Sequence, residues 1–192
     1  MSKYLIVYAH PGHDGHNGYL LKVLQDRLKA KNLDFEVLDL YQLKWDPVLK
    51  NNELYTAGRK DVAEETKAIQ QKIKTADRLI FIYPTWWQNM PAILKGFFDR
   101  VFIKNFAYVY KSGIPIGLLR NKRAAVFTTT SGRAFFFYLI GQPSLRLVTR
   151  YTLLFCGIRS KGFFLGKARK LENNKTRLEK IAKRIISYLA QK

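Results

Sequence analysis

RLIFIYPTWWQNMPAILKGFFDRV, residues 78–101, decides the fold class. Its first part, 78–83, is apolar after the arginine, as expected of a strand buried on both faces of a sheet. Pro91 then opens a second apolar stretch that runs to Val101, because proline favours the first turn of a helix. A strand, a loop and a helix in this order form the repeating unit of a parallel sheet covered by helices.

The same alternation continues in both directions along the chain. Apolar runs predict strands at 4–9, 35–40, 78–83 and 124–129, and a weaker strand at 158–165 that Gly162 interrupts. Amphipathic stretches predict helices at 17–31, 62–75, 91–101, 143–155 and 171–190. These segments predict an α/β fold with a five-stranded parallel sheet. The length of 192 residues predicts one domain, 1–192.

The cysteine content and the length of the apolar runs indicate in which cellular compartment the protein is expected. Cys156 is the only cysteine, so the chain cannot form an internal disulfide, and a reducing cytosol is the expected location. Its apolar neighbours favour a small buried side chain over a reactive thiol. We see no secretory signal at the N-terminus. The longest apolar run, 134–141, is far shorter than the ~18 residues of a membrane span.

The charge is strongly positive and unevenly distributed. The formal net charge is +20, of which residues 1–100 carry +3 and residues 101–192 carry +17. No acidic residue lies between Asp99 and Glu172. Such a distribution favours an anionic partner, which could be a dinucleotide phosphate, an anionic membrane surface or nucleic acid, although a solvated surface explains it equally well. Nucleic acid is the least favoured partner, because the sequence contains no recognisable RNA- or DNA-binding motif.

In a parallel sheet, ligands bind beyond the carboxyl ends of the strands. The first loop there, AHPGHDGHNG (9–18), holds all three histidines and leads into a helix, whose N-terminal N–H groups favour phosphate. His10 and His16 could donate to phosphate oxygens, Asn17 could cap the helix, and His13 is better explained as an ordinary loop residue. A metal site is disfavoured, since neither cysteine nor paired carboxylates complement the histidines. The loop matches neither a P-loop nor the glycine fingerprint of dinucleotide-binding folds.

Two further loops follow the strands at 78–83 and 124–129. YPTWWQNMP (83–91) places two adjacent tryptophans at a strand end, where the loop could lie along the edge of a planar aromatic ligand; alternatively Trp86 or Trp87 caps the core. TTTSGR (128–133) offers hydroxyls and backbone amides to the polar edge of such a ring, or is an ordinary turn.

These segments resemble a known family. YPTWWQNMPAILKGFFDRVF (83–102) is similar to the signature of the NAD(P)H:quinone oxidoreductases and the related bacterial modulator-of-drug-activity B proteins. AHPGHDGHN, FAYVY (106–110) and TTTSG support the resemblance, which spans most of residues 3–158. It implies a flavodoxin-like three-layer sandwich, non-covalent FAD or FMN, and a homodimer with active sites at its interface. It also implies ping-pong hydride transfer from NAD(P)H to the flavin and then to a quinone-like acceptor.

Carried over by motif, three groups of residues would bind the flavin. The phosphates would be held by His10, His16 and Asn17, and the isoalloxazine ring would be lined by Pro84, Thr85, Trp86, Trp87 and Gln88. The other edge of the ring would contact Thr129, Thr130, Ser131 and Gly132. The resemblance assigns no catalytic residue here, because the histidine that assists hydride transfer in well-known members has no counterpart downstream, although Tyr138 could replace their tyrosine.

Several details stay open at this stage. Gln88 and Asn89 replace an aromatic-glycine pair of well-known members, and TTSG replaces TTGG, so the acceptor is not defined. The apolar segment 134–141 could cover the flavin, join a dimer interface or pack in the core. A 2′-phosphate of NADPH could be bound by Arg120, Lys122, Arg123 or Arg133. The main alternative function is a flavin-binding regulatory subunit of a membrane ion-efflux system, whereas a one-electron carrier is disfavoured by the positive charge.

Overall fold

The computed structural model describes residues 3–54 and 62–191. Its centre is a parallel sheet with strand order β2-β1-β3-β6-β7. The strands are β1 (Tyr4–Tyr8), β2 (Phe35–Asp39), β3 (Arg78–Pro84), β6 (Arg123–Thr129) and β7 (Arg159–Leu165). This is a doubly wound sheet, in which the order of the strands along the sheet reverses between β1 and β3 while all strands stay parallel. It confirms the predicted fold class.

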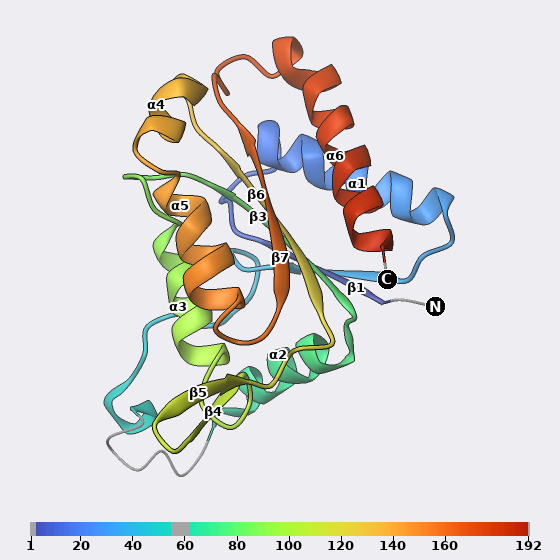
Figure 1. Cartoon of the computed structure of the whole chain (residues 1–192). Coiled ribbons are helices and arrows are strands. Elements are labelled where there is room, and N and C mark those ends of the chain that lie inside the picture. The colour runs from blue at the N-terminus through green and yellow to red at the C-terminus, as the bar shows by residue number, and fades with distance from the viewer. Residues whose placement is uncertain (1–2, 55–61, 192) are drawn as a thin grey trace.

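Helices cover both faces of the sheet (Figure 1). One face carries α1 (His16–Ala30) and α6 (Lys175–Ala190), which is preceded by the short turn η4 (Glu172–Asn174). The other carries α2 (Glu64–Thr75), α3 (Ala92–Val101) and α5 (Pro143–Arg146), which continues as the π-helix η3 (Leu147–Leu153). The loop between β2 and α2 contains the 3₁₀ turn η1 (Asn51–Glu53).

The alternation of side chains along each strand divides the core into two clusters. On β1, Leu5 and Val7 belong to the cluster under α2, α3 and η3, whereas Tyr4, Ile6 and Tyr8 belong to the cluster under α1 and α6. All five residues are at most 2% exposed. Both faces of the strand are therefore buried, which explains why its sequence is continuously apolar.

The structure contains elements that the sequence pattern did not predict. Residues 108–117 form a hairpin of β4 (Tyr108–Lys111) and β5 (Ile114–Gly117), and the apolar segment 134–141 begins with the helix α4 (Ala134–Leu139). Ser112 and Gly113, the two turn residues of the hairpin, both have positive φ, as a type I′ hairpin turn requires.

The prediction that Gly162 interrupts its strand is wrong, since β7 is continuous. A Cβ at Gly162 would lie 3.2 Å from the Leu145 side chain, so the glycine allows α5 to approach the strand closely.

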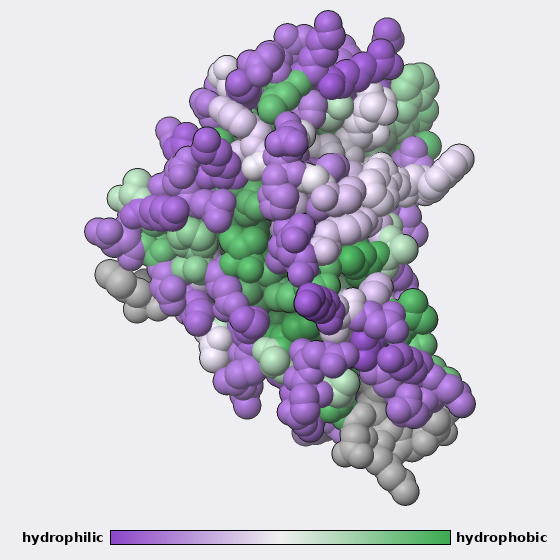
Figure 2. Space-filling model, turned by 180° about the vertical axis from the view of Figure 1, so that it is seen from behind, coloured by the Kyte–Doolittle hydropathy of each residue, from purple (hydrophilic) through white to green (hydrophobic). Residues whose placement is uncertain are grey.

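The exposed surface is mixed. Seen from behind, mostly hydrophilic side chains surround a central group of hydrophobic ones, and further hydrophobic side chains lie along the border on the side of α4 and α5 (Figure 2). Within the described ranges, no helix is both long and apolar enough to cross a membrane.

Candidate functional site

Three loops meet at the carboxyl edge of the sheet, as the sequence predicts. They follow β1, β3 and β6, which are neighbours in the sheet. Ala9 N–H donates to Ile82 O at 2.9 Å, and Thr85 N–H donates to Thr129 O at 2.8 Å. The rings of His10 and Trp86 lie 6.4 Å apart. The candidate phosphate-binding and ring-binding residues therefore belong to one continuous region.

The loop after β1 is pressed against the first turn of α1. The Tyr8 hydroxyl donates to Gly12 O at 2.7 Å, and His10 Nδ1 lies within hydrogen-bond distance of both the N and the O of Gly12. A Cβ added at Gly18 would lie 1.8 Å from His13 O. Only glycine fits at this contact. A glycine at position 18 of α1 is therefore required for the loop after β1 to pack against the helix.

The three histidines have different environments. His13 stacks on Tyr8 at 4.7 Å, and its Nε2 lies 2.8 Å from Asp39 Oδ2, which agrees with a structural loop residue. His16 Nε2 lies 3.2 Å from Asn174 Nδ2. Burial lowers the pKa of His16, and a hydrogen bond to the backbone of Lys170 opposes that change.

Asn17 does not cap α1, so that prediction is wrong. The N-cap is Gly15, and Asn17 is the second residue of the helix and only 3% exposed. Its Oδ1 is buried without a hydrogen-bond partner in the described part of the structure. A buried amide oxygen without a hydrogen-bond partner lowers the stability of the fold. If the side-chain amide of Asn17 is turned by 180°, its NH₂ group takes the place of its oxygen and becomes a donor there. A phosphate at the end of α1 would accept from the flipped amide.

The loop after β3 contains a tight and strained turn. Trp86 and Asn89 exchange two backbone hydrogen bonds of 2.9 Å, and the residues between them, Trp87 and Gln88, both have positive φ. This backbone is unfavourable for bulky side chains and is common at functional sites. Trp87 is completely exposed and Trp86 is 42% exposed, so neither caps the core as the alternative required. Neither hydrogen bond of the turn uses the N–H of Trp87 or Gln88.

Hydroxyl groups connect the loop after β3 to the loop after β6. Thr85 Oγ1 lies 2.8 Å from Thr128 Oγ1 and donates to Ser144 Oγ at 3.2 Å. Thr129 is buried and Thr130 is half-buried, whereas Ser131 and Gly132 are exposed at the tip. The buried threonines hold the loop in place, and the exposed tip residues are available to a ligand.

The sequence did not identify two groups that adjoin these loops. Asn174 is 3% exposed and reaches His16, while its Nδ2 also donates to Lys167 O and Lys170 O. The cationic segment 166–177 therefore lies next to the first turn of α1. Its excess of lysine and arginine was the only signal in the sequence. Ser144 is the second omission, and no local motif marks it.

Three of the four residues proposed for a 2′-phosphate lie at the opposite edge of the sheet, which contradicts that role at this site. Arg120 donates to Gly117 O, Lys122 Nζ to Lys74 O and Ala76 O, and Arg123 to Gln191 O. Arg133 alone is at the carboxyl edge, as the N-cap of α4. The described residues contain no group of three or more His, Cys, Asp or Glu side chains that could hold a metal ion.

The apolar segment 134–141 is divided between two roles. Phe137 is 3% exposed and stacks on Phe164 at 4.0 Å, so it packs in the core. Phe135, Phe136, Tyr138 and Leu139 are each more than half exposed. Those four side chains are available to a ligand or to a second subunit.

Comparisons with known proteins agree with this geometry. Residues 2–189 match the model of a family described by its flavodoxin-like fold. The chain is 34% identical over 127 residues to an uncharacterized NAD(P)H oxidoreductase of Haemophilus influenzae, a match that covers 66% of this chain and 63% of the relative. It is 32% identical over 179 residues to the human ribosyldihydronicotinamide dehydrogenase [quinone], covering 82% and 78%.

A solved structure is similar as well. The NAD(P)H:quinone oxidoreductase from Methanothermobacter marburgensis superposes with a TM-score of 0.82 at 27% identity, and the match covers 94% of this chain and 97% of that one. Strand order, the site at the carboxyl edge and these similarities lead to one conclusion: the chain belongs to the flavodoxin-like family.

Proposed function

We propose that this chain is a flavin-dependent NAD(P)H oxidoreductase that reduces quinones or similar small acceptors by ping-pong hydride transfer. It acts as one flavodoxin-like domain over residues 1–192, in a homodimer, in a reducing cytosol. The observation that carries the proposal is the strained turn at Trp87 and Gln88, which lies at the carboxyl edge beside the loop after β1. The relatives whose names describe NAD(P)H or quinone oxidation support the reaction class.

The residues present fit a flavin. The N-terminus of α1 and the unsatisfied amide of Asn17 suit its phosphate, together with His10 and His16. The N–H groups of Trp87 and Gln88 suit the acceptor atoms of the ring, with Pro84, Thr85 and Trp86 beside it. The loop Thr129–Gly132 suits the opposite edge. A bound flavin supplies the hydride-accepting and hydride-donating centre; the protein positions it and sets its surroundings.

A homodimer would cover an apolar strip that a single chain leaves in solvent. The strip is formed by exposed side chains from three segments. These are Tyr110 and Ile114 of the hairpin, Tyr151 of η3 with Leu154 and Phe155 directly after it, and the exposed side chains of α4. Tyr108 and Phe155 are in contact at 4.9 Å, which joins the hairpin to the end of η3. Contiguous apolar patches of this kind commonly mark protein interfaces.

The test is the absorption spectrum of the purified chain with FAD and with FMN, followed by NADPH or NADH and then menadione. The proposal predicts a flavin band that the reduced nucleotide bleaches and the quinone restores. The flavin released on denaturation distinguishes FAD from FMN. A chain that binds neither flavin would overturn the proposal. The alternative, a regulatory subunit of an ion-efflux system, rests on the basic charge of the second half alone.

A further inference from the structure

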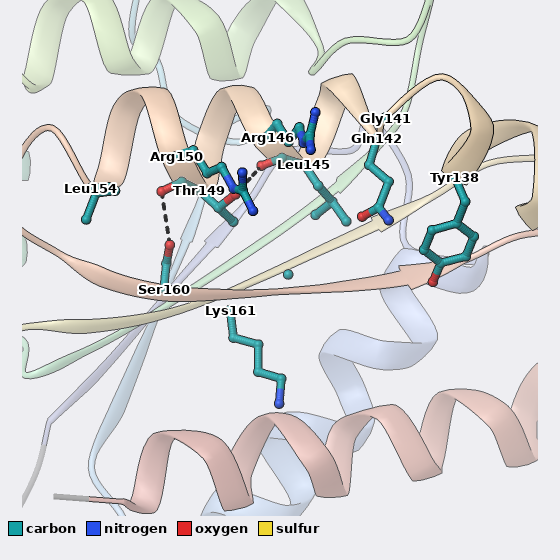
Figure 3. Close-up of a pocket in the computed structure, with 11 residues that line it drawn as sticks. Tyr138, Gly141, Gln142, Leu145, Arg146, Thr149, Arg150, Leu154, Ser160 and Lys161 are labelled. Atoms are coloured by element: carbon teal, nitrogen blue, oxygen red, sulfur yellow. Dashed lines mark hydrogen bonds between the residues drawn. The ribbon is translucent and has the colours of Figure 1, made fainter.

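A cavity lies between the helix formed by α5 and η3 and the edge strand β7 (Figure 3). Its volume is about 560 Å³, which is within the usual range of small-molecule sites. All the residues that line it fall between Tyr138 and Gly162. The cavity is therefore built from one part of the chain, and it includes none of the residues proposed to bind the flavin.

The cavity is bordered by two arginines. Arg146 and Arg150 leave successive turns of the helix, whereas the side chain of Lys161 points from β7 away from this helix and toward α6 (Figure 3). In the described structure, neither arginine side chain forms a hydrogen bond or an ion pair, and the Lys161 ammonium lies 5.7 Å from the centre of the Tyr188 ring. No carboxylate lines the cavity, because all of it comes from the acid-free stretch between Asp99 and Glu172.

Like charges one helical turn apart destabilise a helix, so the pair of arginines carries a cost that a bound anion would offset. Arg146 ends α5, and Arg150 belongs to the unusual helix that follows it. Residues 147–153 form a π-helix, a rare conformation that is frequent at functional sites. The hydroxyl of Thr149 donates to the carbonyl of Leu145 in α5, and the hydroxyl of Thr152 donates to the carbonyl of Leu147.

The wall and floor add polar and apolar groups. Ser160 Oγ lies at the β7 side and donates to Thr149 O at 3.2 Å, while Gln142 borders the end nearest α4. Leu145 and Gly162 form the floor, where the absence of a side chain at Gly162 leaves the strand accessible. The cavity thus combines two arginines at its border with an apolar interior, while the hydroxyls of Ser160 and Thr149 donate to backbone carbonyls.

We propose that this cavity binds a phosphate-bearing small molecule of about nucleotide size, at a site separate from the flavin. The cations border the opening and do not meet at one point, which suits a diphosphate better than a single small ion. Arginine is suited to phosphate because its planar guanidinium donates two parallel hydrogen bonds. The apolar part of the ligand would lie over Leu145, next to Tyr138 and Leu154 of the apolar strip, so that the cavity would lie at the edge of the proposed dimer interface.

The test is calorimetric titration of the full chain with pyrophosphate and with ADP at physiological ionic strength. The proposal predicts saturable binding of one ligand per chain, weakened about tenfold or more in the double variant Arg146→Gln/Arg150→Gln. The matched control is Arg159→Gln/Lys180→Gln, which removes two exposed cations that do not line the cavity, and it should change the affinity less than about twofold. Amide signals of residues 141–162 in the wild-type NMR spectrum should shift on adding ADP, which tests the site without any variant.

The outcomes are separable. An equal loss of affinity in both double variants, or shifts elsewhere in the spectrum, would overturn the proposal, because the binding would then reflect overall charge. Binding to phosphatidylglycerol vesicles without binding to ADP or pyrophosphate would also overturn it. If the arginine variant raises KM for NADPH and not for NADH, the phosphate belongs to the co-substrate; if neither KM changes, it belongs to a separate nucleotide. Both results support a phosphate site.

Discussion

At the scale of single residues, Gly18 has the most restricted environment near the candidate site. A Cβ there would lie 1.8 Å from the backbone of His13, whereas Gly15 has nothing within 4 Å of an added Cβ. We expect Gly18→Ala to displace the loop 10–15, to lower the free energy of unfolding by about 1–3 kcal/mol, and to weaken flavin binding about tenfold or more. Chemical denaturation and flavin titration measure both effects. Gly15→Ala is the control, and equal effects at the two positions would contradict the prediction.

Trp87 is predicted to lower the stability of the fold and to strengthen flavin binding. Its side chain is fully exposed, so no packing is lost on removal, and its positive φ costs about 1–2 kcal/mol for a residue with a Cβ. Trp87→Gly should therefore be at least as stable as the wild type to urea while binding flavin more weakly. A variant that is destabilised and binds flavin normally would show that the tryptophan serves the fold.

His16 predicts a pH dependence. Burial lowers the pKa of its imidazole in the folded chain, opposed by the backbone of Lys170. As the pH falls through about 6.5, the unfolded chain takes up the proton first, so the unfolding free energy of the flavin-free protein should decrease between that pH and the lower folded pKa. Urea denaturation across this range should show a smaller decrease for His16→Gln. Identical pH profiles for the two proteins would rule out the contribution of His16.

Cys156 illustrates a residue that the sequence described correctly. It is 3% exposed, and burial raises the pKa of its thiol to about 12. Its neighbours Leu153 and Ile158 occupy the same core cluster, whereas Leu154 and Phe155 are exposed.

At the scale of elements, the irregular segment after β2 is anchored to α3 by a buried ion pair. Arg100, 2% exposed, donates to both carboxylate oxygens of Glu53 on η1, and its guanidinium lies 5.1 Å from the Trp45 ring centre. Removing one partner leaves the other charge buried. We expect Arg100→Met to lower the free energy of unfolding by about 3–5 kcal/mol.

The control for that variant lies on the same helix. Lys95 and Asp99 form an exposed pair at 2.6 Å, and Lys95→Met should cost less than about 1 kcal/mol in the same urea measurement. Similar losses for both variants would mean that the buried pair contributes no more than an exposed one.

Elements also mark the limits of sequence-based prediction. The five sheet strands and their five major helices follow from periodicity, because burial on one or both faces leaves a repeating apolar pattern. The hairpin at 108–117 and helix α4 have no such pattern, since most of their apolar side chains remain exposed on the described chain. Their conformation follows from turn geometry and from Phe137 packing on Phe164.

At the scale of the whole molecule, the proposed homodimer can be tested through its apolar strip. Tyr151 is 69% exposed within it, and Tyr151→Glu would place a carboxylate in an apolar interface, which is unfavourable. We expect this variant to sediment as a monomer and the wild type as a dimer. Val48→Glu, at a residue 66% exposed outside the strip, is the control. A monomeric wild type, or loss of the dimer in both variants, would contradict the proposed interface.

The sequence by itself determined the strand and helix alternation, the fold class and the three loops that hold the candidate site, because these depend on local pattern and on the rule that parallel strands end at one edge. Only the tertiary structure decided which residues meet there. Asn174 reaches His16 across 158 positions, and Arg120, Lys122 and Arg123 are carried to the far edge of the sheet. Contacts between distant segments depend on how the layers pack, and no short stretch of sequence encodes them.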